Sequence, residues 1–332
     1  AMNRALLTAS SMLLSFALVQ PATAQINDRD LLESSIDGQT AKIMEVNGLP
    51  VRYYEAGEGE PLILLHGGRR SVFNSANMWA ANITGLAKHF HVYAVDRLGY
   101  GLSGMREDGD FRYAAEGGFL DGFIEEMGLD HVNLAGNSSG GALVLEYGMA
   151  HPEKVITLTV AAVGPQTEFF DKPKGDVMRE ACGAVGGQMG WSCWMSAMSH
   201  REGALDQSFW EASQHMMSLP SRRAVAEAQL TAPTEEPNFW VRRRTEWQAG
   251  GVHGLPILWT CGSHDVLDWA AEEEQASLKG CVAFSHTLGA NNPNVKTIIY
   301  NKAGHFPYRE YPELFNNDLI SFINYWDDRR AR

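Results

Sequence analysis

The fold is decided by residues 132–140, which read VNLAGNSSG. An apolar run is followed here by Gly-x-Ser-x-Gly and then by a helical stretch from about Ser139 to Met149. Small residues at both ends of the motif let the chain turn sharply from strand to helix, which holds the serine exposed in a strained backbone conformation. In a chain with 33 glycines the motif alone is a weak signal. In this context it predicts a nucleophile at Ser138 rather than a plain turn.

Other segments repeat the alternation of strand and helix. Continuous apolar runs predict strands at 61–65, 91–95, 155–161, 256–260 and 295–300, and helical spacing recurs at 78–90, 114–127 and 312–326. Two further strands, 41–46 and 51–55, are joined through Asn47-Gly48, which favours a tight hairpin. Strands that are apolar throughout are typical of a parallel sheet covered on both faces. We therefore predict an α/β fold with a mostly parallel sheet and helices on both of its faces.

One long segment departs from this alternation. Residues 164–252 contain no apolar strand run but hold five of the nine tryptophans, with helix-compatible stretches broken by Gly and Pro. We interpret this segment as a helical cap, or lid, inserted into a core formed by residues 25–163 and 253–332. The sequence contains no repeat of 20 to 50 residues after its first segment, which sets solenoids and propellers aside.

The first residues, 1–24, are typical of a signal peptide. Arg4 supplies a positive start, a mostly apolar stretch follows, and Ala22-Thr23-Ala24 is a small-x-small cleavage pattern, so we expect a mature chain from Gln25. The stretch is short for a bilayer, and we expect no membrane span in the mature chain. We predict that the protein is secreted or periplasmic.

Four cysteines would then lie in an oxidising compartment, where disulfides persist. Proximity along the chain favours Cys182 with Cys193 and Cys261 with Cys281, although two other pairings and buried free thiols remain alternatives. The sequence has neither C-x-x-C nor H-E-x-x-H, so no metal site is predicted. The formal net charge of -13 disfavours nucleic acid as a partner, since the mean field repels phosphate.

Two more polar sites follow predicted strands. Asp265 comes after the strand at 256–260 and His305 after the strand at 295–300. Taken singly, Asp265 has the alternative role of a helix N-cap and His305 that of a loop histidine. The order Ser138, Asp265, His305, each at the end of a successive strand, is the triad order of one hydrolase architecture. We therefore predict a Ser-His-Asp triad, with Ser138 as nucleophile, His305 as base and Asp265 as its orienting acid.

A glycine-rich loop, His66-Gly67-Gly68, follows the strand at 61–65. The N–H groups of Gly68 and Ser139 are the predicted oxyanion hole, and Ser139 also opens the helix whose dipole favours negative charge. The alternative is a tight turn. A phosphate-binding loop is excluded because no Lys-Ser/Thr pair follows.

These motifs together resemble the α/β-hydrolase superfamily. The resemblance is carried by residues 65–68, 96–103, 136–141, 262–265 and 304–305, and it covers nearly all of the mature chain except the cap. Gly-Asn-Ser-x-Gly-Gly and the helix from Met78 resemble the lid-bearing esterases and the carbon–carbon bond hydrolases of aromatic-ring catabolism. Ser138 stands where haloalkane dehalogenases and epoxide hydrolases of this fold use aspartate, which disfavours those two reactions.

The predicted reaction is acyl transfer from a small-molecule ester or lactone to water, and it requires no cofactor. We expect specificity from Arg69 beside the oxyanion loop and from cap residues including Trp191, Trp194 and Trp240, although an aromatic stripe is also typical of a cap's own core. The alternatives are a carbon–carbon bond hydrolase of the meta-cleavage-product type, which the predicted export disfavours, and a non-catalytic ligand-binding homologue.

Overall fold

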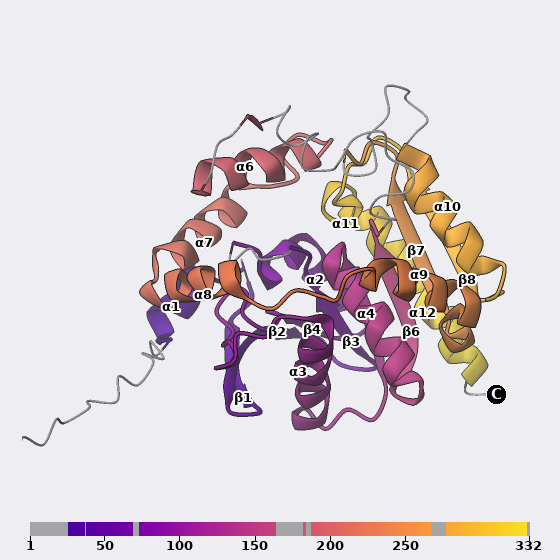
Figure 1. Ribbon diagram of the computed structural model, residues 1–332, viewed down its shortest axis with the longest axis horizontal. Coiled ribbons are helices and arrows are strands. Elements are labelled where there is room, and N and C mark those ends of the chain that lie inside the picture. Colours follow the sequence, from indigo (N-terminus) through magenta and orange to yellow (C-terminus); the bar gives the residue numbers. More distant parts are fainter. Residues whose placement is uncertain are drawn as a thin grey trace, which may run out of the picture.

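The protein is described by a computed structural model that covers residues 26–36, 38–68, 73–163, 182–183, 187–266 and 277–330. Its centre is an eight-stranded sheet with strand order β1-β2-β4-β3-β5-β6-β7-β8 (Figure 1). The strands are β1 Ala41–Val46, β2 Leu49–Ala56, β3 Pro61–Leu65, β4 His91–Val95, β5 Val132–Asn137, β6 Val155–Ala161, β7 Ile257–Gly262 and β8 Val295–Tyr300. Only β2 runs antiparallel to its neighbours, β1 and β4, and all other strand pairs are parallel. The predicted α/β fold with a mostly parallel sheet is confirmed.

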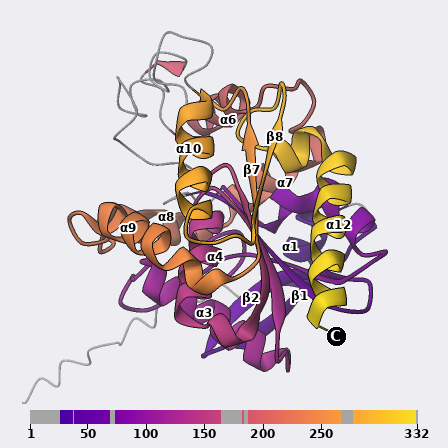
Figure 2. The same ribbon diagram turned by 90° about the vertical axis from the view of Figure 1, so that its right-hand side faces the viewer.

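Helices cover both faces of this sheet. The helices outside the segment between β6 and β7 are α1 Asp28–Glu33, α2 Ala80–Leu86, α3 Tyr113–Glu126, α4 Ser139–Ala150, α10 Ser277–Gly289, α11 Pro307–Glu310 and α12 Pro312–Arg330. Within β3, Ile63 and Leu65 belong to the apolar core shared with α3, α4 and α10, whereas Leu62 and Leu64 belong to the core shared with α2 and α12. Successive side chains of a strand point to opposite faces, so burial on both sides requires the continuous apolar run. In Figure 2, α12 and α10 lie on opposite sides of β7 and β8.

The helix expected at 78–90 differs in detail from the observed structure. A 3-10 turn, Ala76–Trp79, precedes α2, and α2 ends at Leu86. Phe90 is only 1% exposed, although it lies beyond the helix. Because Phe90 is apolar and buried, the helical spacing of apolar residues continues past Leu86. The predicted helix is therefore longer than α2.

Between β6 and β7 the described residues form helices and no strand. These helices are α6 Gly187–Met198, α7 Gln207–Ser218, α8 Pro220–Thr231 and α9 Phe239–Gly250. Figure 1 shows α6, α7 and α8 together at the upper left, with the chain then crossing to α9. Arg222 of α8 is buried and donates hydrogen bonds to the carbonyl oxygens of Gly101 (3.0 Å) and Ser103 (2.7 Å), which hold α8 on the loop after β4.

Two disulfides are present, Cys182–Cys193 and Cys261–Cys281, the pairing that chain proximity favours. The first joins Cys182 to α6 and the second joins the end of β7 to α10. Residues 1–25, read above as a signal peptide and its first following residue, lie outside the described residues. Among those that are described, no helix is both long and apolar enough to cross a membrane.

Candidate active site

Ser138 lies at the junction of β5 and α4, between Asn137 at the end of the strand and Ser139 at the start of the helix. Its backbone has φ 52° and ψ −121°, a combination that L-residues rarely adopt. The turn needs glycine at 140, because a Cβ there would lie 2.4 Å from the carbonyl oxygen of His66. Ser138 therefore sits on the sharp, strained turn that the sequence predicts, directly against the loop after β3.

His305 and Asp265 are in contact. The Nδ1 atom of His305 lies 2.6 Å from Oδ2 of Asp265, and both side chains are buried. Asp265 follows β7 and His305 follows β8, two neighbouring parallel strands whose ends meet at one edge of the sheet. The amide of His264 also donates to the carbonyl oxygen of Ala303 at 2.8 Å, which joins the two loops. A carboxylate only accepts, so Nδ1 carries a proton, and in the neutral imidazole the lone pair is on Nε2.

The loop of His305 is tied to the turn of the serine through Asn137. The side-chain amide of Asn137 donates to the carbonyl oxygens of His305 (3.1 Å) and Ala161 (3.2 Å), and the amide of Ser138 donates to Ala161 as well (2.8 Å). Asn137 is fully buried, so these bonds fix the backbone of the histidine beside the residue that precedes the serine. The structure thus brings Ser138, Asp265 and His305 to the same edge of the sheet.

The loop after β3 is fastened to the start of α4. Gly68 has φ +98°, and a Cβ there would lie 2.6 Å from Cγ of Asn74. The hydroxyl of Ser139 donates to the carbonyl oxygen of Gly68 at 2.5 Å. Because that carbonyl is bound from the helix side, the two residues expected to form the oxyanion hole are held together.

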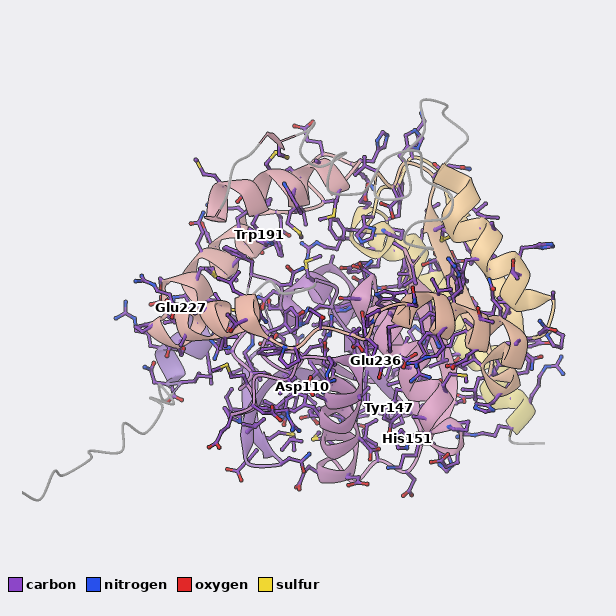
Figure 3. The ribbon with its side chains drawn as sticks, in the orientation of Figure 1. Asp110, Tyr147, His151, Trp191, Glu227 and Glu236 are labelled. Atoms are coloured by element: carbon purple, nitrogen blue, oxygen red, sulfur yellow. A yellow bond between two sulfur atoms is a disulfide. The ribbon has the colours of Figure 1, made fainter. Side chains whose placement is uncertain are left out.

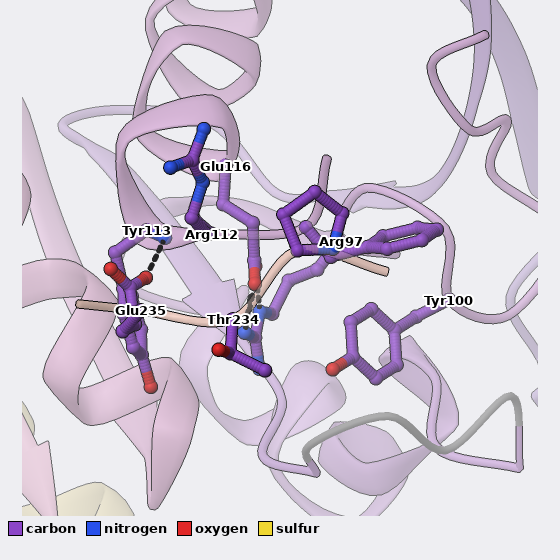
Figure 4. Close-up of a pocket in the computed structure, with 9 residues that line it drawn as sticks. Arg97, Tyr100, Arg112, Tyr113, Glu116, Thr234 and Glu235 are labelled. Atoms are coloured by element: carbon purple, nitrogen blue, oxygen red, sulfur yellow. Dashed lines mark hydrogen bonds and ion pairs between the residues drawn. The ribbon is translucent and has the colours of Figure 1, made fainter. Parts of the chain in front are cut away.

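Arg97, which follows β4, binds the loop after β3 through its guanidinium group. Its Nη1 donates to the carbonyl oxygens of His66 (3.1 Å) and Gly68 (3.2 Å) and to Oγ of Ser139 (2.7 Å). Its other nitrogens form a bidentate pair with Glu116 of α3, at 2.7 and 2.8 Å. Both side chains are buried and line a pocket of about 20 Å³, too small for an ester (Figure 4). Sequence reasoning missed this role of Arg97, for which the only signal was a charged pair directly after an apolar strand.

His66 is a buried neutral group within this network. Burial, with help from the Arg97 charge, lowers the pKa of His66 to about 3. Nδ1 of the ring lies 2.7 Å from the carbonyl oxygen of Gly67, and Nε2 accepts from the amide of Arg97 at 3.2 Å. Both ring nitrogens are thus occupied by the backbone, so His66 shapes the loop and is not a second base.

The sequence profile described as the alpha/beta hydrolase family matches residues 62–318. The chain belongs to the alpha/beta hydrolase family. The match begins in β3, spans the loops that carry all the site residues above and ends in α12.

Relatives of this alpha/beta hydrolase include a dienoic acid hydrolase and a carboxylesterase. The chain is 35% identical over 129 residues to 2-hydroxy-6-oxo-6-(2'-aminophenyl)hexa-2,4-dienoic acid hydrolase of Metapseudomonas resinovorans, a match that covers 39% of this chain and 44% of that relative. The chain therefore spans less than half of that relative's length. Carboxylesterase YbfK of Bacillus subtilis is 27% identical over 275 residues, 79% of each chain. The crystal structure of that carboxylesterase has a TM-score of 0.67 at 22% identity, covering 89% of this chain and 95% of its own, which shows a shared fold.

Among the residues expected to set specificity, Trp191 contacts the segment that follows the loop after β3. Its indole stacks on Phe73 with 4.7 Å between ring centroids, and its Nε1 donates to Oδ1 of Asn74 at 3.4 Å. Figure 3 shows Trp191 between α6 and α7. Trp194 is 41% exposed, and Trp240 packs against Tyr113, Phe239 and Trp247 where α9 meets α3. Arg69 lies outside the described residues.

No group of three or more His, Cys, Asp or Glu side chains is placed to hold a metal ion in the part of the chain that the structure describes. The site built above consists of a hydroxyl, an imidazole, a carboxylate and backbone amides. That set suits nucleophilic acyl transfer.

Proposed function

We propose that the protein is a serine hydrolase that cleaves a carboxylic ester or a lactone through an acyl-enzyme. Ser138 is the nucleophile, His305 the general base and acid, and Asp265 the group that orients the imidazole. The observation that carries the proposal is the 2.6 Å contact between His305 and Asp265 at the sheet edge where Ser138 occupies its strained turn. Family membership supports hydrolysis in general, and the similarity to a carboxylesterase over 79% of each chain favours the ester among its reactions.

In the first half-reaction, Nε2 of His305 takes the proton of the Ser138 hydroxyl while Oγ forms a bond to the substrate carbonyl carbon. The amides of Gly68 and Ser139 donate to the resulting oxyanion, and Asp265 stabilises the imidazolium. The tetrahedral intermediate collapses when His305 returns the proton to the leaving alcohol oxygen. Each oxyanion donor is expected to contribute about 2.7–4 kcal/mol to transition-state stabilisation.

In the second half-reaction, water replaces the alcohol. His305 takes a proton from the water, the hydroxide attacks the acyl carbon, and Ser138 leaves with that proton. The carboxylic acid product and the free enzyme result. For a lactone the alcohol stays attached to the product, and the balance of atoms is the same.

The direct test is covalent labelling with a fluorophosphonate, which reacts with a serine whose proton a neighbouring base removes. We expect stoichiometric labelling of the purified protein and none of Ser138→Ala. Ser285→Ala is the control, because Ser285 lies on α10 and its hydroxyl donates to the carbonyl oxygen of Val282 in the same helix. A folded wild-type protein that never reacts would leave a non-catalytic ligand-binding homologue as the better account.

A carbon–carbon bond hydrolase of the meta-cleavage-product type is the second candidate. It is favoured by the 35% identity to a dienoic acid hydrolase, although that match covers only part of both chains. The same triad would serve, since water again attacks a carbonyl carbon. Assay of a ring-cleavage dienoate beside short aryl esters separates the two, and dienoate turnover with inert esters would reverse our preference.

We also propose that residues 164–252 form a cap over the site, with Trp191 and Arg69 in the substrate wall, and that the protein works in the periplasm or outside the cell. The cap is supported by α6 to α9, which interrupt the core between β6 and β7. Export is supported by the signal-like residues 1–24 and by two disulfides. N-terminal sequencing after cell fractionation is the test: we expect Gln25 in the exported fraction, and an uncleaved cytoplasmic chain would contradict export.

A further inference from the structure

Glu310, the last residue of α11, has a carboxylate that accepts hydrogen bonds from four backbone amides. It is 1% exposed. Its Oε1 accepts from the amides of Gly304 (2.9 Å) and Phe306 (3.3 Å), the two neighbours of His305. Its Oε2 accepts from the amides of His200 (3.0 Å) and Arg201 (2.8 Å), which follow α6. One buried side chain thus joins both flanks of the histidine to the segment between β6 and β7.

A second bond runs between the same two segments. The amide of His305 itself donates to the carbonyl oxygen of Met198, the last residue of α6, at 2.8 Å. On the far side, Nη1 of Arg201 donates to the carbonyl oxygen of Glu310 at 2.6 Å. The backbone from 304 to 306 is therefore held at three successive amides. Met198 binds the amide of His305 directly, and the Glu310 carboxylate that binds the other two also binds the amides of residues 200 and 201.

We propose that Glu310 is a positioning residue for the reaction, a latch that keeps the His305 imidazole in register only while the end of α6 is docked. The inference rests on the proposed function, because it assumes that His305 is the base. If residues 198–201 move away, the carboxylate loses two of its four donors and His305 loses the acceptor for its own amide. The imidazole then shifts relative to Asp265 and Ser138.

The chemistry of the side chain explains why a glutamate is needed. A carboxylate offers two acceptor oxygens, each able to bind two N–H groups, and the charge strengthens each bond. Glutamine has the same shape, but its NH₂ group replaces one of the two acceptor oxygens. That group would face two backbone amides, which are also donors. Aspartate keeps the charge but is one methylene shorter, so it reaches one segment and not both.

The test compares Glu310→Gln with Glu313→Gln, a matched control because Glu313 is exposed at the start of α12, three residues away. A misplacement of about 1 Å in a reacting group costs up to roughly 100-fold in rate. We expect Glu310→Gln to lower kcat for an aryl ester by about 10- to 100-fold, with KM within about twofold of wild type, and to slow fluorophosphonate labelling in parallel. We expect Glu313→Gln to match wild type in all three.

Several outcomes would overturn the latch. A Glu310→Gln variant that loses thermal stability but keeps kcat and labelling rate makes Glu310 merely structural. A rise in KM with unchanged kcat makes it a determinant of substrate binding through the cap. If Glu310→Gln does not fold, Glu310→Asp is measured instead, and wild-type kcat in that variant overturns the proposal. Failure of the wild-type protein to label overturns the proposed function itself, which distinguishes the two failures.

Discussion

The Arg97–Glu116 pair allows stability and catalysis to be separated in one experiment. Arg97 is 3% and Glu116 4% exposed, and the two are joined by hydrogen bonds of 2.7 and 2.8 Å. Arg97→Met leaves the Glu116 carboxylate buried without its guanidinium, which costs about 3–5 kcal/mol of unfolding free energy. In Arg97→Met/Glu116→Leu both charges are gone and similar volumes remain, so we expect most of that loss to be recovered.

Catalysis should not be recovered in the double variant. Arg97, and not Glu116, donates to the carbonyl oxygens of His66 and Gly68 and to the hydroxyl of Ser139. Without it the oxyanion loop loses its anchor, and the loss of one well-placed oxyanion donor lowers kcat by about 100- to 1000-fold, which is the ceiling for this effect. We therefore expect a stable double variant with kcat at least about 10-fold below wild type.

The assays are urea unfolding with linear extrapolation and steady-state hydrolysis of an aryl ester. Arg106→Met is the control, because Arg106 forms an exposed ion pair with Asp108 and such pairs contribute only about 0–1 kcal/mol. A double variant as unstable as Arg97→Met would refute the argument from buried charge. A double variant with wild-type kcat would refute the role of Arg97 in holding the oxyanion loop.

Three further changes test the frame around the site. Gly140→Ala puts a Cβ 2.4 Å from a backbone carbonyl, so we expect loss of soluble protein or of activity, whereas Gly117→Ala meets no atom within 4 Å and should leave ester hydrolysis unchanged. Burial raises the pKa of Glu146 to about 7, so the folded state binds this proton more tightly than the unfolded state and stability falls as pH rises from about 4.5 to 7. Glu146→Gln should reduce the difference in unfolding free energy between pH 5 and pH 8, measured by urea unfolding, by up to about 3 kcal/mol. An unchanged dependence of stability on pH would contradict the pKa shift. Cys261→Ser/Cys281→Ser removes a disulfide between residues 20 positions apart in the chain and should lower the unfolding free energy by about 3 kcal/mol. An unaltered urea midpoint would contradict this expectation.

Local patterns predict the strands well, because a strand buried on both faces is a continuous apolar run. That run can be recognised without knowing which distant residues pack against the strand. The runs at 61–65, 91–95 and 155–161 coincide with β3, β4 and β6. Helix ends are less well predicted, because Phe90 is buried by the tertiary fold after α2 has ended. Neither α1 nor α10 was expected, although the buried residues Cys281, Phe284 and Leu288 of α10 recur with helical spacing.

The groups that hold the site together have no local signature. Arg97 meets Glu116 across 19 residues, and Glu310 meets His200 across 110. Their contacts are mostly to backbone amides and carbonyls, which every residue type supplies. A motif can therefore predict the reacting side chains, whose chemistry is specific, but it cannot predict the side chains that fix their backbone.

Arg222 and Glu310 form two of the charged contacts between the α6–α8 region and the core, and they differ in what remains when the contact breaks. Burial lowers the pKa of Arg222 on α8 to about 10, and if α8 lifted, its guanidinium would move with it into water and regain hydration. Glu310 is different because it belongs to the core: if residues 198–201 left, its carboxylate would stay among the loop residues with half of its donors gone. Opening at α8 is therefore less costly than opening at the end of α6. A lid that admits substrate by moving α8 leaves the position of His305 unchanged. A lid that moves the end of α6 displaces His305 from the position in which it acts as the base. The kcat of Glu310→Gln measures how strongly the position of His305 depends on the contacts of Glu310.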